Sequence, residues 1–126
     1  MKELTKAEEQ IMQIIWKTDG GFVKDIVAEF DDPKPAYNTV STIIRILETK
    51  GFLDHKSFGK TYQYFPLVSK EEYQHGFFKK FINNYFDNSF RGLLSFFSKE
   101  GDLSIEEMEE IKKIMQTEIE NKKAGR

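Results

Sequence analysis

Five polar side chains share one side of a short segment, residues 37–50. They are Asn38, Thr39, Ser41, Thr42 and Arg45. Apolar residues recur on the opposite side at spacings of three and four, which predicts a helix that ends before Gly51. Short hydroxyl and amide groups can approach base edges in the major groove of DNA, and a guanidinium can bridge O6 and N7 of guanine. The segment therefore has the composition of a DNA-recognition helix.

Each of these side chains also has an ordinary structural interpretation. Arg45 could contact a phosphate, or pair within its helix with Glu48 or Thr49. Thr39 and Thr42 could bond only to the helix backbone. The exposed position of all three, in a helix followed by a hairpin, favours contact with DNA.

A basic β-hairpin is predicted directly after this helix. Two β-prone runs, residues 52–58 and 61–65, flank the turn residues Gly59 and Lys60. Lys56 and Lys60 lie at or near its tip. Their amines are expected to bind DNA phosphates, which would strengthen binding without reading sequence. Solubility charges on an exposed hairpin are the alternative interpretation.

No residue pattern predicts catalysis, a metal or a cofactor. The chain has no cysteine, which excludes thiol chemistry, disulfides and cysteine-ligated metals. The chain has two histidines, His55 and His75. Acidic residues at the spacing of metal ligands are not found around both of them, so no metal site is expected. Asp54 and His55 are neighbours in a strand and are expected to point to opposite faces. Nucleophile elbows, phosphate loops and metalloprotease motifs are absent, so the chain is not expected to be an enzyme.

Charge is unevenly distributed along the 126 residues. The net charge is −2, yet five basic residues stand against two acidic ones, Glu48 and Asp54, between residues 33 and 66. An electropositive centre on an acidic protein is compatible with nucleic-acid binding.

The charged first residues do not resemble a signal peptide, and no stretch approaches the roughly 20 apolar residues of a membrane span. A soluble, cytoplasmic protein without membrane insertion is expected.

The N-terminal part is predicted to be a winged helix-turn-helix domain, residues 1–68. Thr5 and Glu8 have capping-box spacing before an amphipathic helix that ends at Asp19. A second short helix is predicted for residues 22–30, and two prolines then separate it from the helix of residues 37–50. Three helices followed by a hairpin is the order of a winged helix. The fold class is mainly α with a small β-hairpin.

Residues 69–126 are predicted to form a helical dimerisation region. Ser69 with Glu72, and Ser104 with Glu107, have capping-box spacing at the start of helices. The apolar stripe that follows is wider than one small domain can bury. The side chains expected in the dimer interface are Phe77, Phe78, Phe81, Phe86, Phe90, Phe97, Met108, Ile111 and Met115. A pocket for a small apolar ligand is the alternative use of the same stripe.

Four stretches together resemble the BlaI/MecI/CopY family of penicillinase repressors. They are residues 4–16 (LTKAEEQIMQIIW), 37–55 (YNTVSTIIRILETKGFLDH), 60–67 (KTYQYFPL) and 102–111 (DLSIEEMEEI). The resemblance covers nearly the whole chain. It implies a homodimeric transcriptional repressor whose winged domains bind a palindromic operator in double-stranded DNA. By position, it places Thr39, Thr42 and Arg45 in the recognition helix and Lys56 and Lys60 in the basic wing.

The chain departs from the family's pattern in two places that bear on function. Family members often carry basic residues where this chain has Asn38 and Ser41, so a different operator sequence is expected. The family's inactivating cleavage falls between Asn and Phe, and the corresponding pair here is Phe96-Phe97. Repression could be relieved by a membrane-bound sensor protease at this pair, or by any other loosening of the C-terminal helices. Copper sensing through cysteines is excluded.

Two rival functions stay open at this point. A winged-helix module that binds a protein would fit the acidic overall charge. A ligand-sensing regulator would place its effector in the aromatic C-terminal region. Steep salt dependence of binding would favour DNA over a protein partner.

Overall fold

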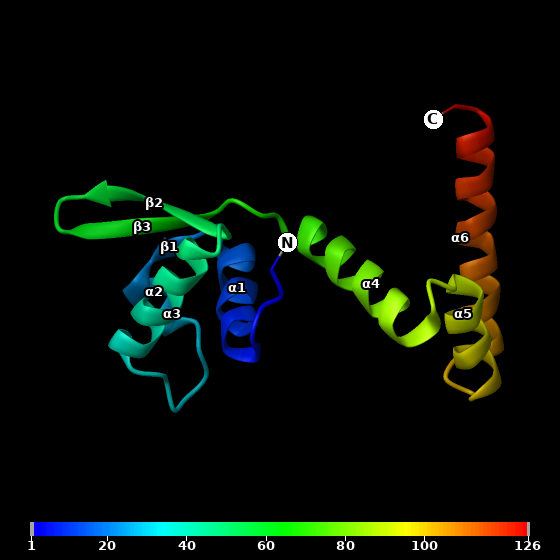
Figure 1. The fold of residues 1–126 in the computed structure, drawn as a ribbon, viewed down its shortest axis with the longest axis horizontal. Helices are drawn as coiled ribbons and strands as arrows, with labels where there is room; N and C mark the ends of the chain where they lie inside the picture. Colours follow the sequence, from blue (N-terminus) through cyan, green and yellow to red (C-terminus); the bar gives the residue numbers. More distant parts are fainter. Residues whose placement is uncertain (1, 126) are drawn as a thin grey trace. The chain divides into compact units, whose positions relative to one another are not determined.

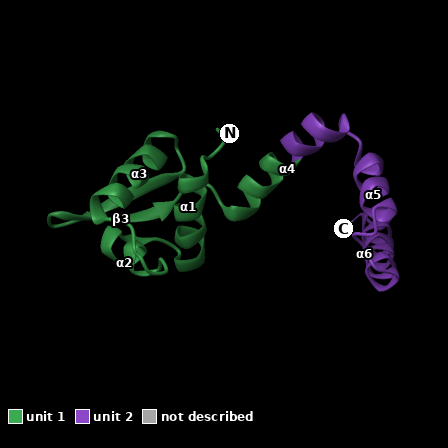
Figure 2. Cartoon of the chain, turned by 90° about the horizontal axis from the view of Figure 1, so that it is seen from below, with its two compact units in different colours: residues 1–78 green, residues 79–126 purple. Residues whose placement is uncertain are grey.

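The computed structural model describes residues 2–125 and divides into two compact units, residues 1–78 and residues 79–126 (Figures 1 and 2). Six helices and three strands follow in the order α1 (Lys6–Thr18), β1 (Gly21–Phe22), α2 (Val23–Ala28), α3 (Tyr37–Thr49), β2 (Leu53–Phe58), β3 (Thr61–Pro66), α4 (Lys70–Phe86), α5 (Phe90–Lys99) and α6 (Ile105–Lys123). The predicted fold class, mainly helical with a winged helix-turn-helix arrangement, is confirmed.

The wing is part of a three-stranded antiparallel sheet with the order β1-β3-β2. The predicted hairpin is confirmed: β2 pairs with β3 from Leu53 opposite Pro66 to Phe58 opposite Thr61. The third strand was not predicted, and a helix start at Phe22 is wrong by one residue. Phe22 is extended and pairs with Gln63 of β3, so α2 begins at Val23.

Gly20 permits this close approach of β1 to β3. Its φ angle is 100°, and a Cβ atom at this position would lie 2.2 Å from the carbonyl oxygen of Tyr64. Any residue with a side chain would collide with the backbone of β3 and adopt a strained conformation. The glycine therefore fixes where the chain leaves α1 and joins the sheet.

The core of the first unit lies between α1, α2, α3 and the base of the sheet. Its fully buried members are Ile11, Met12, Ile15, Ile26, Val40, Ile44, Leu47, Phe52 and Leu53. α3 contributes every third or fourth residue to this core, so its opposite side faces solvent. The packing of α3 thus determines which of its side chains are available for binding.

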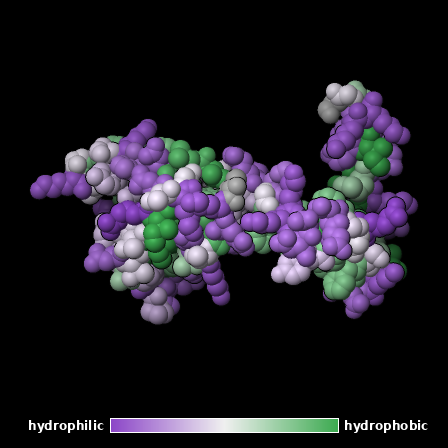
Figure 3. All heavy atoms as spheres, viewed as in Figure 1, coloured by the Kyte–Doolittle hydropathy of each residue, from purple (hydrophilic) through white to green (hydrophobic). Residues whose placement is uncertain are grey.

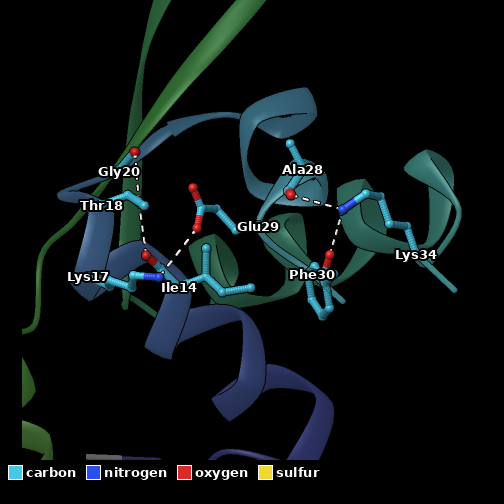
Figure 4. A network of polar contacts seen from close by, with 8 residues as sticks. All are labelled: Ile14, Lys17, Thr18, Gly20, Ala28, Glu29, Phe30 and Lys34. Carbon is cyan, nitrogen blue, oxygen red and sulfur yellow. Dashed lines mark hydrogen bonds and ion pairs between the residues drawn. The ribbon is translucent and has the colours of Figure 1, made fainter. Parts of the chain in front are cut away.

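A network of polar contacts closes the turn between α2 and α3 (Figure 4). The Nζ atom of Lys34 donates hydrogen bonds to the carbonyl oxygens of Ala28 and Phe30, at 2.9 and 2.5 Å. It satisfies carbonyls that the end of α2 leaves without helical partners. Lys17 and Glu29 form an exposed ion pair of 3.5 Å that links α1 to the same turn. Lys34 therefore has a structural role at the end of α2.

The first turns of α4 pack against the winged-helix core. The ring of Tyr73 lies 5.8 Å from the rings of both Trp16 and Phe52, and its hydroxyl accepts a hydrogen bond of 3.3 Å from the backbone of Leu4. The indole of Trp16 donates to the carbonyl of Val68 at 2.9 Å. The first compact unit accordingly extends to Phe78, inside α4.

The second unit has almost no core of its own. Positive φ angles at Asp87 and Asn88 end α4, and the side chain of Ser89 then caps α5. Within residues 79–125, only Ile82 and Leu93 are buried hydrophobic residues, and no residue of α6 is buried. No helix among residues 2–125 has the length and hydrophobicity needed to cross a membrane.

Candidate nucleic-acid interface

The polar side of α3 is exposed, as the sequence predicts. Asn38, Thr39, Thr42 and Arg45 are exposed, and Ser41 is half-buried. They project from the side of the helix opposite the buried Val40, Ile44 and Leu47. A rigid helix carrying short donors and acceptors on its outer side has the geometry required to reach base edges.

The guanidinium of Arg45 lies back along its own helix. Its Nε and Nη2 atoms donate to the carbonyl and hydroxyl oxygens of Ser41, both at 3.4 Å. The pairing with Glu48 that the sequence left open is not formed, because Glu48 contacts His55 instead. Hydrogen bonds of this length are weak, so Arg45 can exchange them for stronger ones with a ligand.

Two threonine hydroxyls of α3 donate to the helix backbone. Thr42 donates to the carbonyl of Asn38 at 2.9 Å, and Thr49 donates to that of Arg45 at 3.0 Å. For Thr42, bonding to the helix backbone is the structural interpretation that the sequence offered beside contact with DNA. It leaves the hydroxyl oxygens with acceptor capacity, because a hydroxyl has two lone pairs.

A cavity of about 280 Å³ lies between the start of α3 and the wing. It brings together two predicted site residues, Ser41 and Lys60. Lys24, Tyr37 and Tyr62 also line it, although the sequence pattern did not single them out. Two amines and several hydroxyl groups together can bind an anion, and the phosphates of DNA are bound by groups of these kinds.

The two wing lysines lie in different surroundings. Lys60 follows the turn residue Gly59, whose φ angle is 61°, and it is exposed beside the cavity. The Nζ atom of Lys56 lies over the ring of Phe65, 5.9 Å from its centroid, and the side chain is exposed. The structure therefore does not place Lys56 in the cavity with Lys60.

A second hollow, of about 470 Å³, lies on the outer side of α3. Thr42, Arg45, Ile46 and Thr49 line it together with two lysines, Lys2 and Lys50. The side chain of Ile46 is 43% exposed there, which gives an apolar contact next to Arg45. Apolar side chains at such positions can contact the methyl group of thymine.

The base of the wing joins α3 through Glu48 and His55. The carboxylate of Glu48 contacts Nδ1 of His55, and the backbone amide of His55 donates to Asp54 at 2.8 Å. Asp54 and His55 follow each other in β2, and the Asp54 carboxylate bends back to this backbone amide, so that one of its oxygens lies within 4.8 Å of a ring nitrogen of His55. Burial raises the pKa of the Tyr64 hydroxyl next to this group, and the negative charge of Glu48 raises it further.

The C-terminal helices carry an extensive exposed hydrophobic surface, which we call the C-terminal hydrophobic face. Its members in the second unit are Tyr85, Phe90, Leu94, Phe96, Phe97, Ile105, Met108, Ile114, Met115 and Ile119. Figure 3 shows hydrophobic atoms at the surface of α6 between hydrophilic ones. Of the predicted interface residues, Phe77, Phe78, Phe90, Phe97, Met108 and Met115 are exposed, and Phe81, Phe86 and Ile111 are half-buried.

The sequence profile of the penicillinase repressor family matches residues 4–117. The chain belongs to the penicillinase repressor family. Among its relatives, the methicillin resistance regulatory protein MecI of Staphylococcus aureus strain N315 is 33% identical over 114 residues, which cover 90% of this chain and 93% of that protein. The penicillinase repressor of Bacillus licheniformis is 24% identical over 122 residues, covering 96% of this chain and 95% of that protein.

The winged-helix part of this repressor is similar to a solved structure, the solution structure of the DNA binding domain of the repressor BlaI. The TM-score is 0.50 at 26% sequence identity, and the match covers 58% of this chain and 94% of that domain. The resemblance inferred from the sequence is therefore confirmed, and this protein is a DNA-binding transcriptional repressor rather than an enzyme.

Proposed function

We propose that this repressor binds a palindromic operator as a homodimer, with one α3 helix of each copy in the major groove. Residues 1–68 bind DNA and residues 69–126 dimerise. The two recognition helices enter successive major grooves about 34 Å apart, and the bound dimer blocks transcription. The exposed polar side of α3, backed by a fully buried apolar side, is the observation that supports this proposal most strongly.

Sequence readout is assigned to the outer side of α3. Arg45 exchanges its weak bonds to Ser41 for a bidentate contact with a guanine. Asn38, Thr39, Ser41 and Thr42 provide shorter-range contacts along the same side. Asn38 and Ser41 are uncharged, so fewer phosphates are bound there than by a basic recognition helix.

The wing is assigned to the DNA backbone. Lys60 and the cavity residues Lys24 and Tyr37 bind one phosphate group between the wing and the start of α3. Lys56 binds another phosphate from the opposite face of the hairpin. Such contacts hold the recognition helix in register and do not read the base sequence.

Dimerisation is assigned to the C-terminal hydrophobic face together with Phe77, Phe78, Phe81, Phe86 and Ile111. Side chains such as Ile114 and Met115 are half exposed or more on α6, and no residue of that helix is buried in a single copy. Complete burial of one such side chain contributes about 1.5–3 kcal/mol. A second copy of the same chain offers a surface of matching character, and the two-fold symmetry agrees with a palindromic operator.

Release from DNA is assigned to loss of the dimer. Separation of the two halves removes the advantage of linked binding to two half-sites. The bond between Phe96 and Phe97 lies inside α5, where the carbonyl of Phe96 accepts a hydrogen bond of 3.1 Å from Glu100. A membrane-bound sensor protease would therefore cleave this bond only after α5 unwinds locally.

The dimer assignment is tested with Met115→Glu, which introduces a charge into the C-terminal hydrophobic face. We expect this variant to sediment as a monomer at micromolar concentration and to bind operator at least about tenfold more weakly. Thr117→Glu is the matched control, because Thr117 is exposed and lies two residues further along α6, on its opposite side. A Met115→Glu protein that stays dimeric and binds normally would show that another surface forms the dimer.

A further inference from the structure

Among residues 2–125, a group of three side chains that could bind a metal lies where α3 meets the wing. Glu48 from α3 and Asp54 and His55 from β2 each offer a ligand atom, and these three atoms lie within 4.8 Å of one another. Between residues 33 and 66, Glu48 and Asp54 are the two acidic residues and His55 is the one histidine. All three therefore gather at a single point of the segment assigned to DNA.

The imidazole is held in a defined orientation. Its ring lies 4.2 Å from the ring of Tyr62 and 5.7 Å from that of Tyr64, measured between centroids. Tyr64 is 4% exposed, so it forms a fixed support. Nδ1 is directed at the carboxylate of Glu48. Oriented histidine rings beside carboxylates are typical of metal centres.

Electrostatics favours a cation at this point. Two carboxylate oxygens within 4.8 Å of each other repel. A divalent cation between them neutralises both charges, and a ring nitrogen of the imidazole can supply a lone pair to it. We propose that Glu48, Asp54 and His55 bind a divalent transition-metal ion, with zinc preferred, at the junction of α3 and the wing.

The ligand set determines the class of ion. Imidazole and carboxylate together suit zinc and other first-row transition ions, whereas magnesium and calcium require oxygen ligands alone. Three protein ligands leave one position of a tetrahedral zinc site for water. The partial exposure of Glu48 and His55 provides access for the ion.

The ion would join the recognition helix to the wing and remove two negative charges from the side that faces DNA. This consequence rests on the proposed function, whereas the metal site does not. We expect saturating zinc to raise operator affinity several-fold relative to protein treated with a chelator, because DNA is repelled by uncompensated carboxylates.

The site is tested by isothermal titration of the full-length protein, without a histidine tag, with zinc chloride. We expect one ion per chain, and binding at least about tenfold weaker in His55→Gln and in Asp54→Asn. The control is His75→Gln, which removes an exposed histidine that has Glu71 and Glu72 on the same helix. We expect this variant to bind zinc like the wild type. Equal zinc binding by wild type and His55→Gln would overturn the proposal.

A second measurement locates the ion in the wild-type protein and needs no variant. Manganese is added in small amounts during recording of amide nuclear magnetic resonance spectra. We expect selective broadening at Glu48, Asp54 and His55, with little at His75. Broadening centred on α4 or spread over the acidic residues of α6 would mean adventitious binding and would overturn the assignment. Because both measurements are made without DNA, they remain decisive if operator binding fails.

Discussion

The Nζ atom of Lys50 lies 2.6 Å from Oε1 of Glu8, which joins the end of the recognition helix α3 to the start of α1. Glu8 also accepts a hydrogen bond of 2.8 Å from the backbone of Thr5, so it completes the capping box of α1. Burial would raise the pKa of Glu8, but the hydrogen bonds from Lys50 and Thr5 outweigh it and lower the pKa below its ordinary value. One carboxylate thus stabilises the two helices that position the DNA-binding side chains.

Replacement of Glu8 by glutamine should lower the free energy of unfolding by about 1–3 kcal/mol at neutral pH, because charged hydrogen bonds are lost and Lys50 keeps its charge. A carboxylate whose pKa is lower in the folded than in the unfolded protein contributes its full stabilisation at pH values above its unfolded pKa, about 4.3. Its contribution disappears as the pH falls through the lower folded pKa. The difference between wild type and Glu8→Gln should therefore shrink below about pH 4.

Chemical denaturation at several pH values measures this difference. Glu9→Gln is the control, because the neighbouring residue lies in the same helical turn and takes no part in the capping box. Its effect should stay within about 0.5 kcal/mol. A Glu8→Gln effect that is independent of pH would mean that the ionised carboxylate is not responsible.

Tyr73 should be essential for the stability of the first unit even though it lies in α4. Truncation to alanine removes a ring packed on Trp16 and Phe52, at a cost of about 3–5 kcal/mol. Tyr73→Phe removes only the hydrogen bond to Leu4 and should cost about 1 kcal/mol. Thermal unfolding compares the two variants. Equal, small effects would show that α4 does not pack on the winged-helix core in solution.

The wing lysines should control the salt dependence of DNA binding. Each phosphate contact contributes about 0.9 to the slope of log K against log salt concentration, so Lys56→Ala with Lys60→Ala should lower the slope by nearly two. Affinity for operator and scrambled duplexes should fall alike. The double variant Lys122→Ala with Lys123→Ala, at the end of α6, should leave the slope unchanged. A wing variant with the wild-type slope would remove the wing from the DNA interface.

Much of the fold could be predicted because local signals agree with it. Thr5 with Glu8 and Ser104 with Glu107 form the capping boxes that their spacing predicts. The three- and four-residue periodicity of α3 correctly separates its buried side from its exposed side. These features depend on residues within one helical turn of each other, so the sequence alone contains the information.

Features that depend on distant residues could not be predicted. The strand β1 consists of Gly21 and Phe22, too short for an alternating pattern, and its pairing with β3 depends on Gly20. Tyr73 belongs to an aromatic run that resembles one continuous interface, yet its ring packs on Trp16 and Phe52. Glu48 and His55 lie in different elements, and the chain reverses between them at Gly51, whose φ angle is positive.

Fluorescence anisotropy with a labelled duplex from the DNA upstream of the gene, and a scrambled duplex, tests most directly whether α3 reads sequence. Arg45→Ala should weaken specific binding by roughly 1–3 kcal/mol and leave binding to the scrambled duplex nearly unchanged. Arg45→Lys keeps the charge but loses the bidentate geometry, so it should lose most of the same specificity. Arg91→Ala, on α5, is the control and should bind like the wild type. Equal affinity of wild type and Arg45→Ala for the specific duplex would contradict the account.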